Sequence, residues 1–220
     1  MAAQCDIHYN KRAVGIDVRA REVDFADGSS ARYGNLICTL PLDKTIRLAG
    51  IQVDEKPDPC TSVLVLNIGG SRGPSCPDDH WLYYPTSRSG FHRVGFYSNV
   101  DRSFLPTSAQ ERGDRVSIYV ERTYLNGSKS TDGEIRAYSD GVTQELTEWG
   151  FIESADVADP TWIDVAYTWA WPGSNWKTKA IKLLEEQGVY MVGRYARWSF
   201  QGIAESIRDG FVAGASFKKP

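Results

Sequence analysis

The segment spanning residues 188–210, GVYMVGRYARWSFQGIAESIRDG, holds the residues with the clearest chemical potential. Its apolar start, residues 189–192, is typical of a buried strand that ends at Gly193. Glycine lets a backbone approach a ligand closely, and the planar guanidinium of Arg194 suits a pair of phosphate oxygens.

Gly202 precedes a helical pattern in the same segment. The N-terminus of a helix offers N–H groups without intrahelical partners and a partial positive charge. The segment therefore indicates a site for an anion, or for a ring that becomes anionic on reduction. Spacing alone leaves one alternative open, namely a plain strand, loop and helix with an exposed arginine.

Other polar and aromatic clusters favour structural roles. Asp78, Asp79 and His80 follow Pro77 in a turn-like stretch and are interpreted as solvated rather than as a metal or acid–base site. The tryptophans 169, 171 and 176 surround a proline, which favours a packed corner. The four cysteines are scattered without a C-x-x-C motif, so we expect no metal site and thiols kept reduced in the cytoplasm.

Composition excludes several classes of protein. The 220 residues carry a formal charge of -3 and a pI of about 5.7, without a basic stripe, so nucleic acid is not an expected partner. No apolar run approaches the roughly 20 residues that span a bilayer. The first residues lack the apolar core of a secretory signal, which again favours a cytoplasmic location.

The elements that would position the 188–210 segment follow from hydrophobic periodicity. Strand patterns are predicted at 13–25, 35–39, 62–68, 81–84, 93–97, 115–122, 162–169 and 189–192. Helical patterns are predicted at 43–48, 133–148, 174–187 and 203–213, with Thr131 or Asp132 capping the second and Ser174 the third. Residues 69–74, GGSRGP, are expected to form a loop, and residues 126–132 a polar exposed stretch.

With these elements in place, the segment GRYARWSFQGIAESIRDG resembles the C-terminal flavin-binding segment of the amine oxidase, protoporphyrinogen oxidase and UDP-galactopyranose mutase superfamily. The pattern in that superfamily is Gly-Arg-aromatic-Gly-x-Trp-x-aromatic followed by a helix. The matching positions here are Gly193, Arg194, Tyr195, Trp198 and Phe200. The sequence departs from the pattern at Ala196, where glycine is usual.

Three further stretches resemble the same superfamily in chain order. They are NLICTLPLDKTIRLAG (35–50), HWLYYPTSRSGFHRVGFYSN (80–99) and AYTWAWPGSNWKTKAIKLLEEQG (166–188). They are similar, respectively, to the point where the FAD domain resumes, to the substrate-domain strands, and to the helix before the Gly-Arg loop. The resemblance therefore covers most of the chain.

The resemblance implies a bound FAD. Arg194 would meet the diphosphate, and Gly202, Ile203 and Ala204 would place N–H groups near the flavin ring. The implied cofactor-binding residues are Gly193, Arg194, Trp198, Gly202, Ile203 and Ala204. Tyr83, Tyr84 and Arg93, beside His92, would lie on strands facing the substrate, although ordinary strand aromatics and a solvated arginine are the alternative. No residue is assigned as a catalytic base.

The expected fold class is α+β (α/β): an antiparallel substrate-domain sheet plus the C-terminal part of a FAD-binding, Rossmann-like domain. Residues 1–50 would belong to the FAD-binding domain, 51–160 to the substrate-domain sheet with its helix, and 161–220 to the C-terminal FAD-binding segment.

Flavoproteins of this kind also carry a strand, a G-x-G-x-x-G turn and a helix that cradle the pyrophosphate. No such motif occurs in these 220 residues, and the glycines 69, 70 and 73 have the wrong spacing. We therefore expect a fragment, a subunit of a split enzyme or a truncated product. Alone it would bind FAD weakly or not at all, and it would self-associate or need an N-terminal FAD-binding subunit.

The function implied by the resemblance is that of part of a FAD-dependent oxidoreductase acting on a small organic substrate. Two alternatives stay open at this point. One is part of a mutase-like flavoenzyme acting on a nucleotide sugar, and the other is a non-catalytic binding domain that retains the fold.

Overall fold

The computed structural model describes residues 4–125 and 128–217, which form two compact units. Unit 1 combines the described parts of Met1–Pro59 and Thr168–Pro220, and unit 2 is the continuous segment Cys60–Tyr167. The two terminal parts of the chain therefore fold together, and the middle of the chain forms a unit of its own. The divisions expected from the sequence, after residues 50 and 160, lie nine and seven residues earlier.

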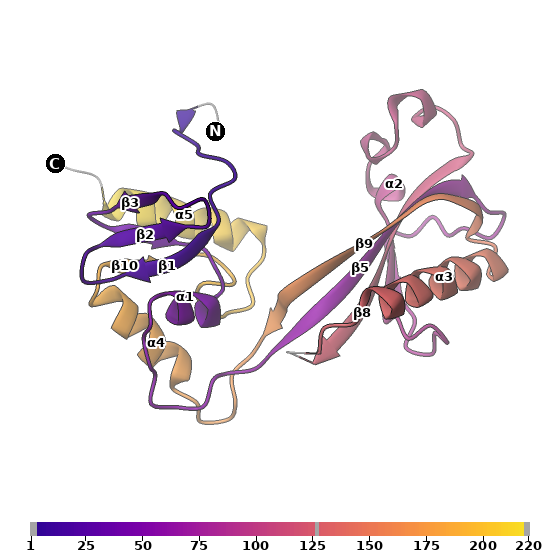
Figure 1. Ribbon diagram of the computed structural model, residues 1–220. Coiled ribbons are helices and arrows are strands. Elements are labelled where there is room, and N and C mark those ends of the chain that lie inside the picture. The colour runs from indigo at the N-terminus through magenta and orange to yellow at the C-terminus, as the bar shows by residue number, and fades with distance from the viewer. Residues whose placement is uncertain (1–3, 126–127, 218–220) are drawn as a thin grey trace. The chain divides into compact units, whose positions relative to one another are not determined.

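Unit 2 is a five-stranded sheet with one long helix packed on it (Figure 1). The strand order is β6-β7-β8-β5-β9. The bounds are β5 Cys60–Arg72, β6 Trp81–Tyr83, β7 Arg93–Phe96, β8 Arg115–Leu125, β9 Ile152–Thr168 and α3 Asp132–Glu148. The short helices α2 Tyr97–Val100, η2 Arg102–Phe104 and η3 Thr107–Ala109 connect β7 to β8.

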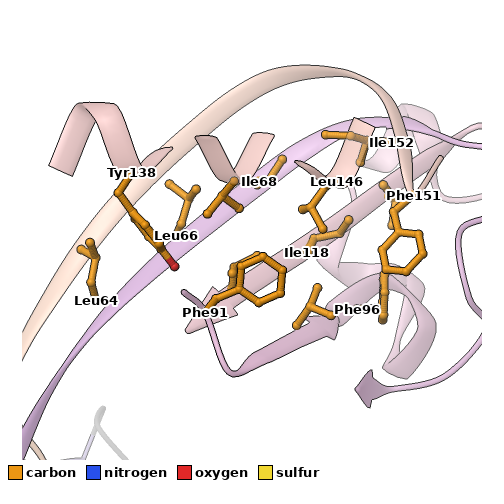
Figure 2. Close-up of a cluster of buried hydrophobic side chains, with 14 residues drawn as sticks. Leu64, Leu66, Ile68, Phe91, Phe96, Ile118, Tyr138, Leu146, Phe151 and Ile152 are labelled. Carbon is orange, nitrogen blue, oxygen red and sulfur yellow. The ribbon is translucent and has the colours of Figure 1, made fainter. Parts of the chain in front are cut away.

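The core of unit 2 lies between α3 and one face of the sheet. Every second residue of β5 and β8 points to this face, as strand geometry requires. Figure 2 shows side chains of the strands and of α3 meeting there. The fully buried members include Leu66, Ile68, Ile118, Val142 and Leu146.

Helix α3 begins as its sequence predicts. The Thr131 hydroxyl accepts the N–H of Glu134, and the Glu134 carboxylate accepts the N–H of Thr131, so the first turn is closed by a capping box. This satisfies backbone donors that the helix itself leaves without partners.

The expected loop at residues 69–74 is corrected by the structure, because β5 continues through Gly69 and Gly70 to Arg72. A Cβ on Gly70 would lie 2.1 Å from the backbone oxygen of Ser154 on β9. These glycines thus mark a close approach of two strands rather than a turn. The strand predicted at 162–169 is likewise longer, since β9 already begins at Ile152.

Unit 1 joins an antiparallel sheet, a two-stranded parallel sheet and three helices. The antiparallel sheet is β1 Ala13–Asp17, β2 Glu22–Phe25 and β3 Ser30–Arg32, and the parallel pair is β4 Leu36–Cys38 with β10 Val189–Met191. The helices are α1 Leu42–Leu48, α4 Trp176–Glu185 and α5 Ile203–Ser216. Helix α4 packs beside α1 and β10, and its Trp176, Ala180 and Leu184 are buried.

The hydroxyl of Ser174 accepts the N–H of Trp176 at 3.1 Å, so the residue predicted to cap α4 does bond to its first turn. The N-cap position itself is Asn175. All four predicted helices are present, and the predicted α+β class, helices combined with an antiparallel sheet, is confirmed. Part of the predicted polar stretch 126–132 lies outside the described residues.

Candidate functional site

A cleft of about 670 Å³ opens in unit 1 where β10 ends and α5 begins. It is bounded by the loop after β10 and by the first two turns of α5. The lining residues are Thr39, Val192, Gly193, Arg194, Tyr195, Gln201, Gly202, Ile203, Ser206, Ile207 and Gly210. Four of the six predicted cofactor-binding residues, Gly193, Arg194, Gly202 and Ile203, are among them.

Gly193 turns the chain at the end of β10 with a φ of +88°. L residues with side chains rarely adopt this left-handed region. A Cβ there would meet no atom of the described chain within 4 Å, so the glycine is required by its backbone conformation rather than by crowding within the chain. The resulting turn leads directly into Arg194 at the cleft.

Arg194 is half-buried and held by its own loop. Its Nη1 donates to the carbonyl of Gln201 at 3.4 Å, and its guanidinium lies 4.8 Å from the centre of the Phe200 ring and 5.6 Å from that of Tyr195. Such contacts hold a cation in place. Arg194 therefore stands as a fixed positive charge at the cleft, next to the start of α5.

The start of α5 is partly closed by a side chain of the helix itself. Gly202 donates its N–H to the Glu205 carboxylate at 3.0 Å. Ile203 and Ala204 follow in the first turn, where N–H groups have no intrahelical acceptor. The negative charge of Glu205 offsets the positive end of the helix. The opening therefore suits a polar ring edge better than a phosphate, while Arg194 carries the full positive charge.

Trp198 does not line the cleft, although it was predicted to contact the cofactor. Only 3% of its surface is exposed, and its ring packs edge-on to Trp176 at 5.3 Å. Its φ of +49° shows that the loop bends sharply there. Ala196, which stands where the superfamily pattern has glycine, is also buried. The aromatic-rich loop thus anchors the cleft to the core of unit 1.

A second group of polar and aromatic side chains occupies the outer face of the unit 2 sheet, opposite α3. Residues directly paired across antiparallel strands share a face. The register aligns Tyr83 with Arg93 and Arg93 with Glu121, and it aligns Trp81 with Gly95 and Gly95 with Tyr119. The predicted substrate residues Tyr83 and Arg93 therefore lie on one face.

Tyr84, the third predicted substrate residue, is not part of this group. Its ring lies 4.7 Å from that of Trp149 and packs against the α3-side core. Tyr83, by contrast, is largely exposed.

Arg93 forms a tight ion pair on the outer face. Its Nη2 donates to both carboxylate oxygens of Glu121 at 2.6 Å and lies 3.4 Å from the hydroxyl of Tyr167. Burial disfavours the positive charge, but the bonds to Glu121 outweigh it and raise the pKa of Arg93 above its ordinary value. Burial also lowers the pKa of the neighbouring His92, against the raising effect of Glu121.

A hollow of about 490 Å³ also lies over the strands β5, β8 and β9. Asn67, Ser117 and Phe104 line it, and Phe104 stacks on Tyr97, which in turn packs on Tyr119. Sequence reasoning predicted Tyr83 and Arg93 but missed the other members of this group, such as Asn67, Tyr119 and Glu121, because they lie far apart in the chain and meet only through strand register. The alternation of polar with apolar residues along 115–121 was the one available signal.

Within the described ranges, no three His, Cys, Asp or Glu side chains gather in a way that could hold a metal ion. The described helices also include none with the length and apolar character needed to cross a bilayer.

Comparison with known proteins identifies the fold. No protein-family model and no curated protein matches the chain. A solved structure of reduced UDP-galactopyranose mutase matches 99% of the chain at a TM-score of 0.73 and 18% identity. A protein named as a protoporphyrinogen oxidase from Exiguobacterium sp. 255-15 matches 89% at 0.60 and 10% identity. A fatty acid isomerase from P. acnes that produces CLA matches 95% at 0.54 and 13% identity.

The chain therefore has the fold of the corresponding part of these structures. The fold-level resemblance seen in the sequence is therefore confirmed. The chain spans about half the length of these structures, covering 49%, 43% and 48% of them respectively. At such identities the likeness concerns the fold, and the chemistry has to be argued from the residues of this chain.

Proposed function

We propose that this chain is the C-terminal portion of a FAD-dependent oxidoreductase and that the cleft in unit 1 holds part of the flavin dinucleotide. The observation that carries the proposal is the meeting of Gly193, Arg194 and the start of α5 at one cleft of about 670 Å³. A close-approaching backbone, a fixed guanidinium and helix N–H groups are what a phosphate-linked planar ring requires.

Each residue has a distinct part in this proposal. Arg194 would hold phosphate oxygens of the dinucleotide with its positive charge, and the N–H groups of Ile203 and Ala204 would serve the polar edge of the ring. Tyr195 and Ile203 line the cleft and supply apolar surface to it. The flavin, when bound, would supply the redox chemistry. The outer face of unit 2, with Arg93 and Tyr83, would contact a small organic substrate.

A mutase-like flavoenzyme part acting on a nucleotide sugar is the second candidate. The highest TM-score of the three structures above, 0.73 over 99% of the chain, favours it. A non-catalytic domain that keeps the fold would instead leave the cleft without affinity for any flavin. In both flavin-dependent cases, the rest of the cofactor site would come from an N-terminal FAD-binding subunit or from self-association.

The test compares FAD with riboflavin, which lacks the diphosphate, on the isotope-labelled chain. We expect FAD at millimolar concentration to shift the amide signals of Gly193, Gly202 and Ala204, and riboflavin to bind at least tenfold more weakly. That ratio corresponds to about 1.4 kcal/mol. Arg194→Ala should abolish the preference for FAD, whereas Arg208→Ala, which removes an exposed arginine of α5, should preserve it. Equal binding of FAD by the wild type and Arg194→Ala would remove Arg194 from the site.

A further inference from the structure

Arg122 lies where the apolar core on the α3 side of unit 2 comes to its end. Alternate residues of β8 share a face, and the face with the buried Ile118 and Val120 continues to Arg122. The side chain of Arg122 is half-buried and donates from Nη1 to the carbonyl of Ser89 at 3.4 Å. Along residues 4–125 and 128–217, no Asp or Glu carboxylate forms an ion pair with it. A half-buried charge without a counter-ion is costly, which indicates that an anion belongs beside it.

Two tyrosine rings and a glycine hold this guanidinium in position. Its central carbon lies 5.1 Å from the centre of the Tyr124 ring and 5.4 Å from that of the Tyr138 ring. A Cβ on Gly90 would come within 3.5 Å of the same carbon, so the loop before β7 also rests on the arginine. Aromatic contacts occupy the face of a guanidinium. Its N–H edge is then left for a pair of anionic oxygens.

A hollow of about 640 Å³ opens beside Arg122, between α3, the end of β8 and the loop before β7. The lining residues are Arg88, Ser89, Arg122, Tyr124, Ser130, Glu134, Ala137, Tyr138 and Gly141. Two small residues one turn apart, Ala137 and Gly141, form its wall on α3. Glycine inside a helix is destabilising relative to alanine, and a Cβ on Gly141 would meet only Ser89 Oγ beyond the helix itself, at 3.5 Å. The chain could therefore hold alanine there, and glycine keeps the hollow wider.

One side chain of the hollow carries a buried hydroxyl without a partner. Only 6% of Tyr138 is exposed, and its hydroxyl oxygen forms no hydrogen bond within the described ranges. Figure 2 shows the ring reaching from α3 toward the sheet. Burial raises the pKa of Tyr138 above its ordinary value, so the hydroxyl keeps its proton. A buried donor of this kind destabilises the free protein and becomes favourable when an acceptor reaches it.

The charges around the hollow favour a ligand with a single negative charge. Arg88 is already paired with Glu148, with Nη2 and Oε2 2.5 Å apart. The carboxylate of Glu134 accepts the N–H and the hydroxyl of Thr131, and these bonds lower its pKa, so it is ionised at neutral pH. A phosphate dianion would be repelled by Glu134, whereas a monocarboxylate needs only the one charge of Arg122.

We propose that this hollow binds a small monocarboxylate with an apolar body. The carboxylate accepts from the N–H edge of Arg122, and the body lies along Ala137, Gly141 and the Tyr124 ring. As the long side chain of Arg122 moves toward the carboxylate, it uncovers the hydroxyl of Tyr138, which then donates to the ligand. None of these residues belongs to the cleft of unit 1 or to the outer face of unit 2, so the proposal does not depend on the proposed function.

The test titrates 3-phenylpropionate into the isotope-labelled full-length chain. We expect the amide signals of Ser89, Ala137 and Gly141 to shift, and those of Gly193 and Gly202 in the cleft of unit 1 to stay in place. Two probes each lack one part of the ligand: 3-phenylpropionamide has no charge, and inorganic phosphate has no apolar body. Each should bind at least tenfold more weakly than 3-phenylpropionate.

Substitutions separate binding from folding. Arg122→Gln should weaken the binding of 3-phenylpropionate at least tenfold, whereas Arg136→Gln, which removes an exposed arginine of α3 outside the hollow, should leave it unchanged. Tyr138→Phe should raise the midpoint of thermal unfolding of the free chain, because the buried donor is gone, and yet weaken binding at least threefold. Gly141→Ala should likewise stabilise the helix and weaken binding, because its methyl group enters the hollow.

The proposal is overturned if 3-phenylpropionate shifts no signal of the hollow, or if the uncharged amide or phosphate binds as tightly. It is also overturned if Arg122→Gln binds 3-phenylpropionate as well as Arg136→Gln does. Because Tyr138→Phe and Gly141→Ala are expected to stabilise the chain, a loss of affinity in either is not a loss of folding. Full affinity in both would show that the ligand does not lie in this hollow.

Discussion

Glu145, a carboxylate on α3 of which only 3% is exposed, is held entirely by the loop that precedes β7. It accepts the hydroxyl of Ser87 at 3.1 Å and the N–H groups of Arg88 and Ser89 at 3.1 and 2.9 Å. Burial works against its negative charge, but these hydrogen bonds outweigh it and lower the pKa of Glu145 below its ordinary value. One side chain thereby fixes the loop on the helix.

Glu145→Gln should destabilise the protein by about 1–3 kcal/mol. The glutamine amide points an NH2 group at donors of the loop, and a loop donor facing it then lacks an acceptor. Urea unfolding at neutral pH measures this change. Since the folded-state pKa is lowered, the stabilisation is complete above the ordinary value of about 4.3 and is lost as the pH falls through the lowered one. The difference in the free energy of unfolding between the variant and the wild type should therefore become smaller below that pH. A difference that stays constant down to pH 3 would contradict the assignment.

The Arg93–Glu121 pair on the outer face makes a second prediction at this scale. The two side chains are 23% and 12% exposed. Arg93→Leu should cost about 2 kcal/mol, less than for a fully buried pair because solvent still reaches the carboxylate left without its partner. Adding Glu121→Leu should recover part of that loss, which a double-mutant cycle by chemical unfolding measures. If the two substitutions lowered the free energy of unfolding additively, the Arg93–Glu121 pair would have no coupling energy.

At the residue scale, the sequence indicated the Gly193–Arg194 turn because the backbone freedom of glycine and the positive charge of arginine are known from the residue type alone. It misassigned Trp198 to the cleft because an aromatic residue in a loop serves a ligand or a core equally well, and only the packing on Trp176 decides between them. The sequence analysis did not predict the hydrogen bond from the Gly202 N–H to the Glu205 carboxylate. The spacing of three residues between them is nevertheless typical of a helix N-terminus.

At the scale of elements, the pairing of β7 with β8 depends on a glycine. The Tyr119 ring lies across Gly95, where a Cβ would come within 2.0 Å of Tyr119 Cε1. The ring also packs against Tyr97, with centroids 4.6 Å apart. The absence of a side chain at Gly95 thus allows the aromatic ring to lie flat on the outer face of the sheet.

Gly95→Ala should therefore destabilise unit 2 by about 1–3 kcal/mol through overpacking. The same substitution should cost much less in a Tyr119→Ala background, where the ring is gone. Denaturant unfolding of the four proteins gives the coupling. Equal costs in both backgrounds would show that the strand, and not the ring, resists the new methyl group.

Element positions followed from hydrophobic periodicity wherever one face of an element was buried, as in α3 and α4. Periodicity failed at 69–72, where glycines in a central strand resemble a turn until the neighbouring strand β9 is present. It also missed the first half of β9, whose largely exposed residues 153–161 give no apolar alternation. Propensity is local, whereas both of these features are set by a strand distant in sequence.

For the whole molecule, the topology divides the chain in a way that composition does not reveal. The strands β5 and β9 themselves lead into and out of unit 2. The resemblance placed residues 1–50 and 161–220 in one domain, and the structure gathers the two ends of the chain into unit 1. No pattern in the residues themselves required the two ends to meet.

This division makes a prediction about independent folding. Unit 2 is one continuous segment, Cys60–Tyr167, and its core cluster of Leu64 to Ile152 lies entirely within it. A polypeptide of residues 60–167 should therefore fold alone, because the chain closes its own core. Thermal unfolding followed by near-ultraviolet circular dichroism of the packed Trp149 and Phe151 should show a single cooperative transition.

Leu146→Ala, which removes a fully buried side chain from that core, should lower the stability of both the segment and the full chain by about 2–5 kcal/mol. Leu125→Ala, at an exposed position, should change neither. If the segment gave no cooperative transition, or if Leu146→Ala acted on the full chain alone, the core of unit 2 would depend on unit 1. Unit 1 should not fold from either of its pieces, because β4 from the first pairs with β10 from the second, and neither piece contains both strands.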